Sequence, residues 1–444
     1  MTAGTGRRAG ATKTLPTWLQ WALVFVMFAI LSTVLLVRYV PANPELSRMD
    51  EYVYIDAVDK ATRGDLVNQG EMIDDYAMEL ASCRGVESFG KIGTPCGEEI
   101  DPALFPHIGG RTSADIHSPV YYFATAWLGG LIQRVLGVEE LLDAARYSNV
   151  LWLALGLTGL VWAARVLGAS RLSSLGVALL IISTPQVRWS TIYVTPDALN
   201  LIWGSLIVGL GVRVVRDQRS PIWLGLAAAA ATILKVTNIF GVVAIVLFFG
   251  LVALLESETF PTRRAITAGL VTFGSAVAAA AGYQTFRSAT SLGDSPAMDR
   301  QEAFSLRYAI DQIDAFVQGV VLGPQGIFGS TASPNPDSLA NVTSWVVLSG
   351  LFAVAFLHNG EPRVSRRLAQ AWVVSLLGLG PALYVVMNVL EGTVFGLGPR
   401  YGMVLVPGMT SALAISVTRP WVRWTLLAYS IVAYVYILVV IQMR

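Results

Sequence analysis

Residues 18–40 read WLQWALVFVMFAILSTVLLVRYV, and residues 48–61 read RMDEYVYIDAVDKA. The first stretch has the length and the apolar composition of a helix that crosses a membrane. The second places two adjacent acids, Asp50 and Glu51, just beyond the end of that helix. Acidic side chains are costly to hold near hydrocarbon, so their position favours a reaction at the membrane surface on a lipid-attached substrate.

The rest of the chain has the composition of a membrane protein. Of its 444 residues, 54% are hydrophobic and 14% are charged, whereas a soluble domain has about a quarter charged residues. The net charge of +1 gives no reason to expect a nucleic-acid partner. We therefore predict an all-α, polytopic membrane protein with a cytoplasmic tail (residues 1–17), one transmembrane domain (residues 18–444) and no separate soluble domain.

Apolar runs of membrane-spanning length recur along the chain. They predict about eleven crossings, at residues 18–40, 147–164, 172–185, 196–215, 221–234, 237–255, 265–283, 342–357, 368–389, 401–417 and 421–441. Arginines gather in every second connection, and the positive-inside rule assigns those connections to the cytoplasm. This orientation places the N-terminus on the cytoplasmic side of a plasma membrane and the C-terminus outside.

A further apolar run, Pro119–Leu136, would reverse the side of every later basic connection if it also crossed. We therefore expect it to lie in the membrane interface, or to dip in and return. Two long segments, residues 41–146 and 287–341, then face outward. Hydrophobic periodicity predicts juxtamembrane or surface helices in these segments, at residues 51–64, 71–83 and 306–320.

Cys83 and Cys96 lie close together in the first outward segment. In an oxidising compartment such a pair favours a disulfide. Two free thiols, or half of a metal site, are the alternatives, but the chain has only three His and no further Cys with which to complete a zinc site.

Two cations stand at outer ends of the predicted spans. Lys235 is the only lysine after residue 91 and interrupts an apolar run. A buried cation there needs a partner, and a phosphate suits it; the alternative is a lysine that reaches the interface from a helix end. Arg400, followed by Tyr401, lies between a proline and a glycine-rich stretch, where it could bind either a substrate phosphate or lipid headgroups.

Acidic residues and a histidine complete the set of candidates. Asp50 and Glu51 are either a general base that takes a proton from a hydroxyl or a solvated turn that caps the next helix. Asp197 is either an N-cap or an ion-pair partner of Arg188, and His117 either orients a substrate or is structural. The sequence requires no cofactor and leaves a divalent metal ion at Asp50, Glu51 or Asp197 as an open alternative.

These features occur in a characteristic order. The acidic pair follows the first span, and a histidine followed closely by proline opens the juxtamembrane run. RYSNVLWLALG (146–156), TPDAL (195–199), LKVTN (234–238) and PRYGMVLVPG (399–408) come next. Together they resemble the C-type glycosyltransferase (GT-C) superfamily, which uses sugars carried on polyprenyl phosphate. It includes protein O-mannosyltransferases, lipid A aminoarabinose transferases and actinobacterial arabinosyl- and mannosyltransferases. The resemblance covers nearly the whole chain, although each motif alone is loose.

The resemblance implies an active site at the extracytoplasmic mouth of the helix bundle. Asp50 matches the acid that serves such enzymes as base or acceptor ligand, with Glu51 beside it. Lys235 and the Arg400–Tyr401 pair match positions near the donor phosphate. His117 falls in the position of a His-Pro-Pro motif in which Ser118 replaces the first proline here, so the role of that turn departs from the pattern.

The expected function is that of a membrane glycosyltransferase. It would move a sugar from a polyprenyl-phosphate donor to a hydroxyl of an extracytoplasmic glycan, lipid or protein, with inversion at the anomeric carbon. One rival is a transporter or flippase of lipid-linked sugars, which predicts ionisable residues near the midplane and related halves; the sequence shows neither. The other rival is a non-catalytic protein that binds polyprenyl-linked sugars.

Overall fold

The computed structural model describes residues 15–48, 50–105, 110–293, 304–322, 338–357, 363–391 and 398–440. These residues form sixteen α-helices connected by loops and short 3-10 helices. Within the described ranges, β pairing is confined to three isolated bridges in the first outward segment. The prediction of an all-α protein is therefore confirmed, whereas most of the N-terminal tail at residues 1–17 lies outside the described part.

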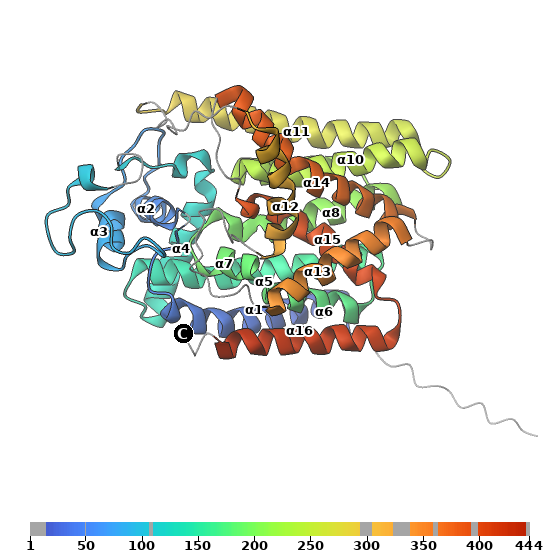
Figure 1. Cartoon of the computed structure of the whole chain (residues 1–444), viewed down its shortest axis with the longest axis horizontal. Helices are drawn as coiled ribbons and strands as arrows, with labels where there is room; N and C mark the ends of the chain where they lie inside the picture. The colour runs from blue at the N-terminus through green and yellow to red at the C-terminus, as the bar shows by residue number, and fades with distance from the viewer. Residues whose placement is uncertain are drawn as a thin grey trace, which may run out of the picture.

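The α-helices are α1 (Thr17–Ala42), α2 (Glu51–Thr62), α3 (Asp75–Cys83), α4 (Pro119–Leu136), α5 (Leu141–Leu167), α6 (Arg171–Ile182), α7 (Pro185–Ile192), α8 (Asn200–Arg216), α9 (Ile222–Leu234), α10 (Ile239–Leu255), α11 (Thr262–Ala289), α12 (Leu306–Leu322), α13 (Ser338–Phe352), α14 (Arg363–Glu391), α15 (Val406–Ser416) and α16 (Pro420–Val440). The long helices lie side by side in one bundle, and α2, α3 and α4 gather at one end of it (Figure 1). We call this end the outer end.

Seven described helical segments are long and apolar enough to cross a membrane. They are Thr17–Ala42, Leu141–Leu167, Pro196–Arg216, Val236–Leu255, Thr262–Ala289, Arg363–Val389 and Pro420–Val439. Three shorter apolar helices accompany them at Arg171–Ile182, Ile222–Leu234 and Val342–Leu357. The chain is thus a multi-pass membrane protein, with seven helices rather than about eleven that satisfy the length criterion for a crossing on their own.

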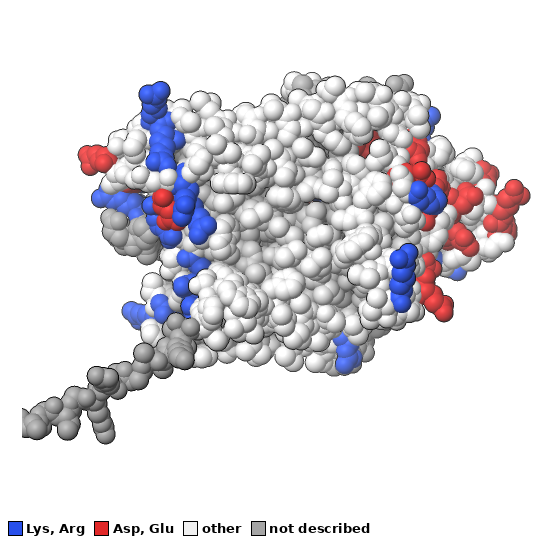
Figure 2. Space-filling model, turned by 180° about the vertical axis from the view of Figure 1, so that it is seen from behind, with Lys and Arg blue, Asp and Glu red and all other residues white. Residues whose placement is uncertain are grey.

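Surface charge is divided between the two ends of the bundle. On the face drawn in Figure 2, Lys and Arg gather mainly at one end and Asp and Glu at the other, with a broad band between them almost free of charge. Such a band is what a helix bundle presents to hydrocarbon, because an exposed charge there is costly.

The run Pro119–Leu136 forms α4, which is not among the seven candidate spans. The start of α4 is set by Ser118, whose hydroxyl accepts a hydrogen bond from the Val120 backbone N–H (3.3 Å), and by Pro119 in the first turn. Its end is set by Gly137, which has the left-handed conformation. α4 packs against α2 and α5. Its Tyr121 side is buried, whereas Trp127 on another side is exposed, as expected of a helix at an interface.

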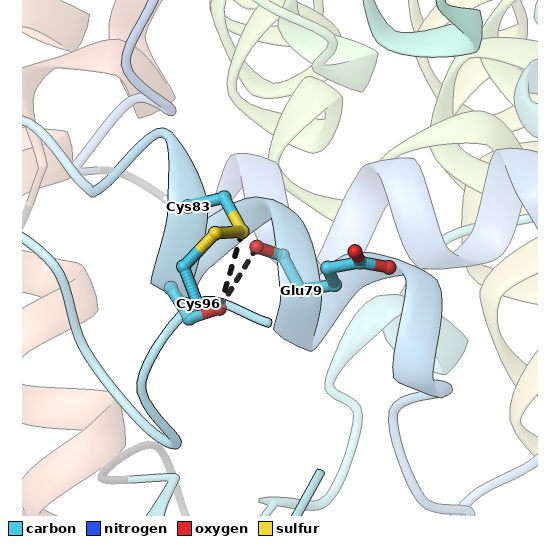
Figure 3. The surroundings of a disulfide bond; sticks show 4 residues. Glu79, Cys83 and Cys96 are labelled. Carbon is cyan, nitrogen blue, oxygen red and sulfur yellow. Dashed lines mark hydrogen bonds between the residues drawn. A yellow bond between two sulfur atoms is a disulfide. The ribbon is translucent and has the colours of Figure 1, made fainter. Parts of the chain in front are cut away.

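The first outward segment forms a small core of its own. Apolar side chains of α2 and α3, including Val53, Ile55 and Met78, pack against the first turns of α4 and α5. Cys83, at the end of α3, forms a disulfide with Cys96 in the following loop (Cα–Cα 4.8 Å; Figure 3). This bond ties the loop to the helix at the outer end of the molecule.

The second outward segment contributes α12, in the place where periodicity predicts a helix. α12 packs on α14 and on the 3-10 helix η7 (Pro399–Leu405). The ring centroids of Phe316 in α12 and Phe240 in α10 are 5.6 Å apart. It is therefore anchored in the bundle, next to Arg400, and is more than the surface helix expected from its sequence.

Candidate functional site

Asp50 and Arg400 meet at the outer end of the bundle. Asp50 is the N-cap residue of α2, and its backbone is left-handed (φ 65°), a conformation that Asp adopts more readily than most residues. Its side chain makes no capping hydrogen bond to α2. Instead, Asp50 Oδ2 accepts a hydrogen bond from Arg400 Nη2 at 2.7 Å, and 29% of the Asp50 side chain stays exposed.

Lys235 lies beside this pair and is buried. It is the residue between α9 and the 3-10 helix that leads into α10, and its backbone there is extended. Lys235 Nζ donates to Asp197 Oδ1, and it lies 5.7 Å from the centre of the Tyr401 ring. The protein itself thus supplies the anionic partner that the sequence left unassigned, and Lys235 does not reach out to solvent.

The Asp197 carboxylate is fixed by its own neighbours. It receives hydrogen bonds from the Thr195 hydroxyl (3.1 Å) and the Asn200 amide (2.8 Å), in addition to Lys235. The predicted alternative, an ion pair with Arg188, is not what the structure has. Arg188 instead donates to the Tyr39 hydroxyl of α1 and lies over that ring at 5.6 Å.

His117 lies on the other side of the same cluster, fully enclosed. Its Nε2 is 3.4 Å from the Tyr54 hydroxyl of α2, and its Nδ1 has no hydrogen-bond partner among the described residues. Burial, together with the positive charges of Lys235 and Arg400, lowers the pKa of His117 well below its usual range. The imidazole is therefore neutral, and Nδ1 is the group that a bound molecule could engage.

Aromatic rings surround the two cations. The Arg400 guanidinium lies 5.6 Å from the Tyr401 ring centre and 5.9 Å from that of Trp189 on α7. Cation–π contacts of this kind hold a charged group in place. The cluster as a whole combines a partly exposed carboxylate with two nearby cations, which suits a substrate that carries both a hydroxyl and a phosphate.

Glu51 takes no part in this cluster. Both of its oxygens are used inside the protein: by Arg146 (2.7 and 2.9 Å), by the Ser47 backbone N–H (2.8 Å) and by the Val194 backbone N–H (2.8 Å). Glu51 and Arg146 have no exposed side-chain surface. Its carboxylate lies in an ion pair between α2 and α5, apart from the Asp50–Arg400 pair, and a catalytic role of Glu51 stays a prediction.

The three candidate acids lie in separate ion pairs. Asp50, Glu51 and Asp197 are each paired with a different cation. Over the described ranges, no group of three or more His, Cys, Asp and Glu side chains is arranged to hold a metal ion.

The loop that carries His117 is clamped from a distant helix. Asp115 Oδ2 accepts a hydrogen bond from Arg287 Nε of α11 at 2.5 Å. The Tyr283 hydroxyl, also on α11, lies within hydrogen-bond reach of the Asp115 and His117 carbonyl oxygens (2.9 and 2.6 Å). These contacts explain how a 3-10 turn in a long loop can present His117 in a fixed position.

Three residues of the cluster were not identified from the sequence. Tyr54 follows Asp50 by four residues, so one helical turn places both on the same side of α2, a spacing that could have revealed it. Trp189 and Asn200 carry no such signal, because their place in the cluster depends on how α7 and α8 pack.

Comparison with known proteins assigns no family to this chain. The chain matches no protein-family model, and no curated protein matches its sequence significantly.

Proposed function

We propose that this protein is a membrane glycosyltransferase of the C-type superfamily. It moves a sugar from a polyprenyl-phosphate donor to an extracytoplasmic hydroxyl acceptor, with inversion. The observation that carries the proposal is the meeting of Asp50, Lys235 and Arg400, which come from distant parts of the chain, in one cluster at one end of a membrane-spanning bundle. A partly exposed carboxylate beside two cations matches the needs of a hydroxyl nucleophile and a phosphate leaving group.

In the proposed reaction the acceptor oxygen attacks the anomeric carbon as the bond from that carbon to the phosphate oxygen breaks. The bonding electron pair leaves with the lipid phosphate, and the hydroxyl proton passes to Asp50. Lys235 and Arg400 stabilise the negative charge that develops on the phosphate. Asp197 and the aromatic rings hold these cations in place before the substrate arrives.

The proposal also fixes an orientation. The chain crosses the plasma membrane about eleven times, with the N-terminus in the cytoplasm and the Asp50 cluster outside. Two observations support this orientation. On the face drawn in Figure 2, Lys and Arg gather mainly at the end opposite the acidic outer end, and the disulfide lies at the outer end. The polyprenyl tail lies among the spans, and the outer loops hold the acceptor.

The test is a donor-turnover assay with purified protein and a panel of polyprenyl-phosphate sugars. We expect the wild type to release polyprenyl phosphate from at least one donor. The variant Asp50→Asn should lose about a hundredfold or more of that rate. Asn suits the left-handed backbone of residue 50 as well as Asp does, so this change removes the charge without straining the turn.

The matched control is Asp65→Asn, an exposed acid in the same outward segment, which should keep the wild-type rate. An unchanged rate in Asp50→Asn would remove Asp50 from the mechanism. Movement of intact lipid-linked sugar across the membrane without bond cleavage would replace the enzyme with a transporter, and donor binding with neither activity would leave a binding protein.

A further inference from the structure

A cavity lies at the end of the bundle opposite the Asp50 cluster. It has a volume of about 170 Å³ and is lined by Val215, Val252, Glu256, Thr259, Phe260, Arg363 and Val364. α10 starts beside Lys235 in the outer cluster and ends next to Glu256, so the length of one membrane span separates the two sites. The cavity is therefore independent of the proposed active site.

The Glu256 carboxylate is buried and only half satisfied. Its Oε1 accepts a hydrogen bond from Arg367 Nε at 2.8 Å and forms an ion pair with Arg367 Nη2, also at 2.8 Å. Its Oε2 has no hydrogen-bond partner in the described part of the chain, and the Arg363 guanidinium is 3.6 Å from it. A buried carboxylate oxygen without a hydrogen bond is costly, so this oxygen is a ready acceptor for a donor that enters the cavity.

The other lining residues indicate the chemistry of the rest of a bound molecule. Val215, Val252, Phe260 and Val364 give the cavity apolar sides. Arg363 stands at the rim, with 62% of its side chain exposed, and a guanidinium at such a rim binds phosphate oxygens well. The cavity thus offers a carboxylate acceptor, apolar walls and a partly exposed guanidinium 3.6 Å from that acceptor.

We propose that this cavity binds a phosphoethanolamine group. The primary ammonium donates to Glu256 Oε2, the two-carbon linker contacts the apolar walls, and the phosphate pairs with Arg363. Basic pockets between membrane helices commonly bind lipid headgroups, and a cavity at the ends of spans lies at headgroup depth. The group can belong to a phosphatidylethanolamine molecule of the adjoining leaflet or to soluble phosphoethanolamine.

The test measures headgroup preference on the intact, full-length protein. Wild-type protein is exposed to equal amounts of phosphatidylethanolamine and phosphatidylcholine with identical acyl chains, and bound lipids are counted by native mass spectrometry. Choline has no N–H, so it cannot donate to Glu256. We expect a preference for phosphatidylethanolamine that falls about tenfold in Glu256→Gln and is unchanged in Glu258→Gln, an exposed acid two residues further along.

The variant Arg363→Gln keeps the Glu256–Arg367 pair and should lower the binding of both lipids, because both carry the phosphate that pairs with Arg363. It covers the case in which Glu256→Gln fails to fold. Soluble phosphoethanolamine, titrated into protein held in phosphatidylcholine alone, separates the two sources. Binding of the soluble compound that depends on Glu256 supports the same site with a cytosolic ligand. Equal binding of both lipids together with no binding of the soluble compound would overturn the proposal. A preference that survives Glu256→Gln, or lipid binding that is unchanged in Arg363→Gln, would also overturn it.

Discussion

At the scale of single residues, Asp50 and Glu51 are neighbours with different surroundings. Asp50 is the left-handed N-cap residue before α2 and Glu51 is the first residue of the helix, so the two side chains point in different directions. Asp50 therefore reaches Arg400 in the partly exposed cluster, whereas Glu51 reaches Arg146 in the interior. The buried pair joins α2 to α5 and fixes the turn from which Asp50 projects.

The buried pair makes a prediction about stability. Glu51→Gln leaves Arg146 without a counter-charge in a fully enclosed position, and we expect it to lower the free energy of unfolding by about 3–5 kcal/mol. Asp50→Asn changes a partly exposed pair and should cost less. Thermal unfolding in the same membrane mimic should show that Glu51→Gln is less stable than Asp50→Asn. Equal stability of Glu51→Gln and wild type would contradict the structural role of Glu51.

His117 predicts a dependence of stability on pH. Its pKa is lowered in the folded state by burial and by Lys235 and Arg400, so the unfolded chain binds the proton more tightly. The contribution of His117 to the free energy of unfolding is complete above about pH 6.5. It is lost as the pH falls below that value, by about 1.4 kcal/mol per pH unit.

The measurement compares wild type with His117→Gln between pH 7.5 and pH 5.5, because all other titrating groups are shared. Wild type should lose about 1.4 kcal/mol more than the variant over this range. A pH profile that is the same in both proteins would show that His117 is free to take up a proton in the folded state.

Part of this site could be predicted from residues alone. The positive-inside rule assigns the arginine-rich connections to one side of the membrane. Following the spans from those connections is enough to predict Lys235 and Arg400 at the same end as Asp50. The pairing of Lys235 with Asp197 could not be predicted in the same way. It depends on the packing of α8 and α9, and the roles that the sequence offered for Asp197 were an N-cap and an ion pair with Arg188.

At the scale of elements, the sequence pattern of the outward segments predicts which residues form helices, whereas tertiary contacts decide where those helices lie. Periodicity finds α2, α3 and α12, because each has an apolar stripe at helical spacing. It does not say what the stripe packs against. α12 covers η7 and α14, so a helix expected on the surface lies beside the residues that hold Arg400.

The disulfide at the end of α3 gives a prediction at this scale. It closes a short loop, since Cys83 and Cys96 are 13 residues apart, and such a closure stabilises the folded state by about 3 kcal/mol. In Cys83→Ser we expect faster amide hydrogen exchange in α3 and in the loop to residue 96, with little change in the spans. Wild type treated with reductant should behave likewise, and unchanged exchange after verified reduction would contradict this role.

At the scale of the whole molecule, the proposed reaction requires that one end of the bundle hold every reactive group. The long helices and the charge-poor band follow directly from composition. The number of crossings is harder to derive. Helices such as α6 and α9 are shorter than a membrane is thick, and only packing against longer neighbours can place them within it.

The most direct test of the central claim is a double-mutant cycle on donor turnover, with Asp50→Asn, Lys235→Met and the double variant. Groups that act in one active site give losses that do not multiply. We predict that each single variant loses about a hundredfold in rate and that the double variant is within a few-fold of the slower single variant. Losses that multiply in the double variant, or a wild-type rate in Lys235→Met, would contradict a shared site for Asp50 and Lys235.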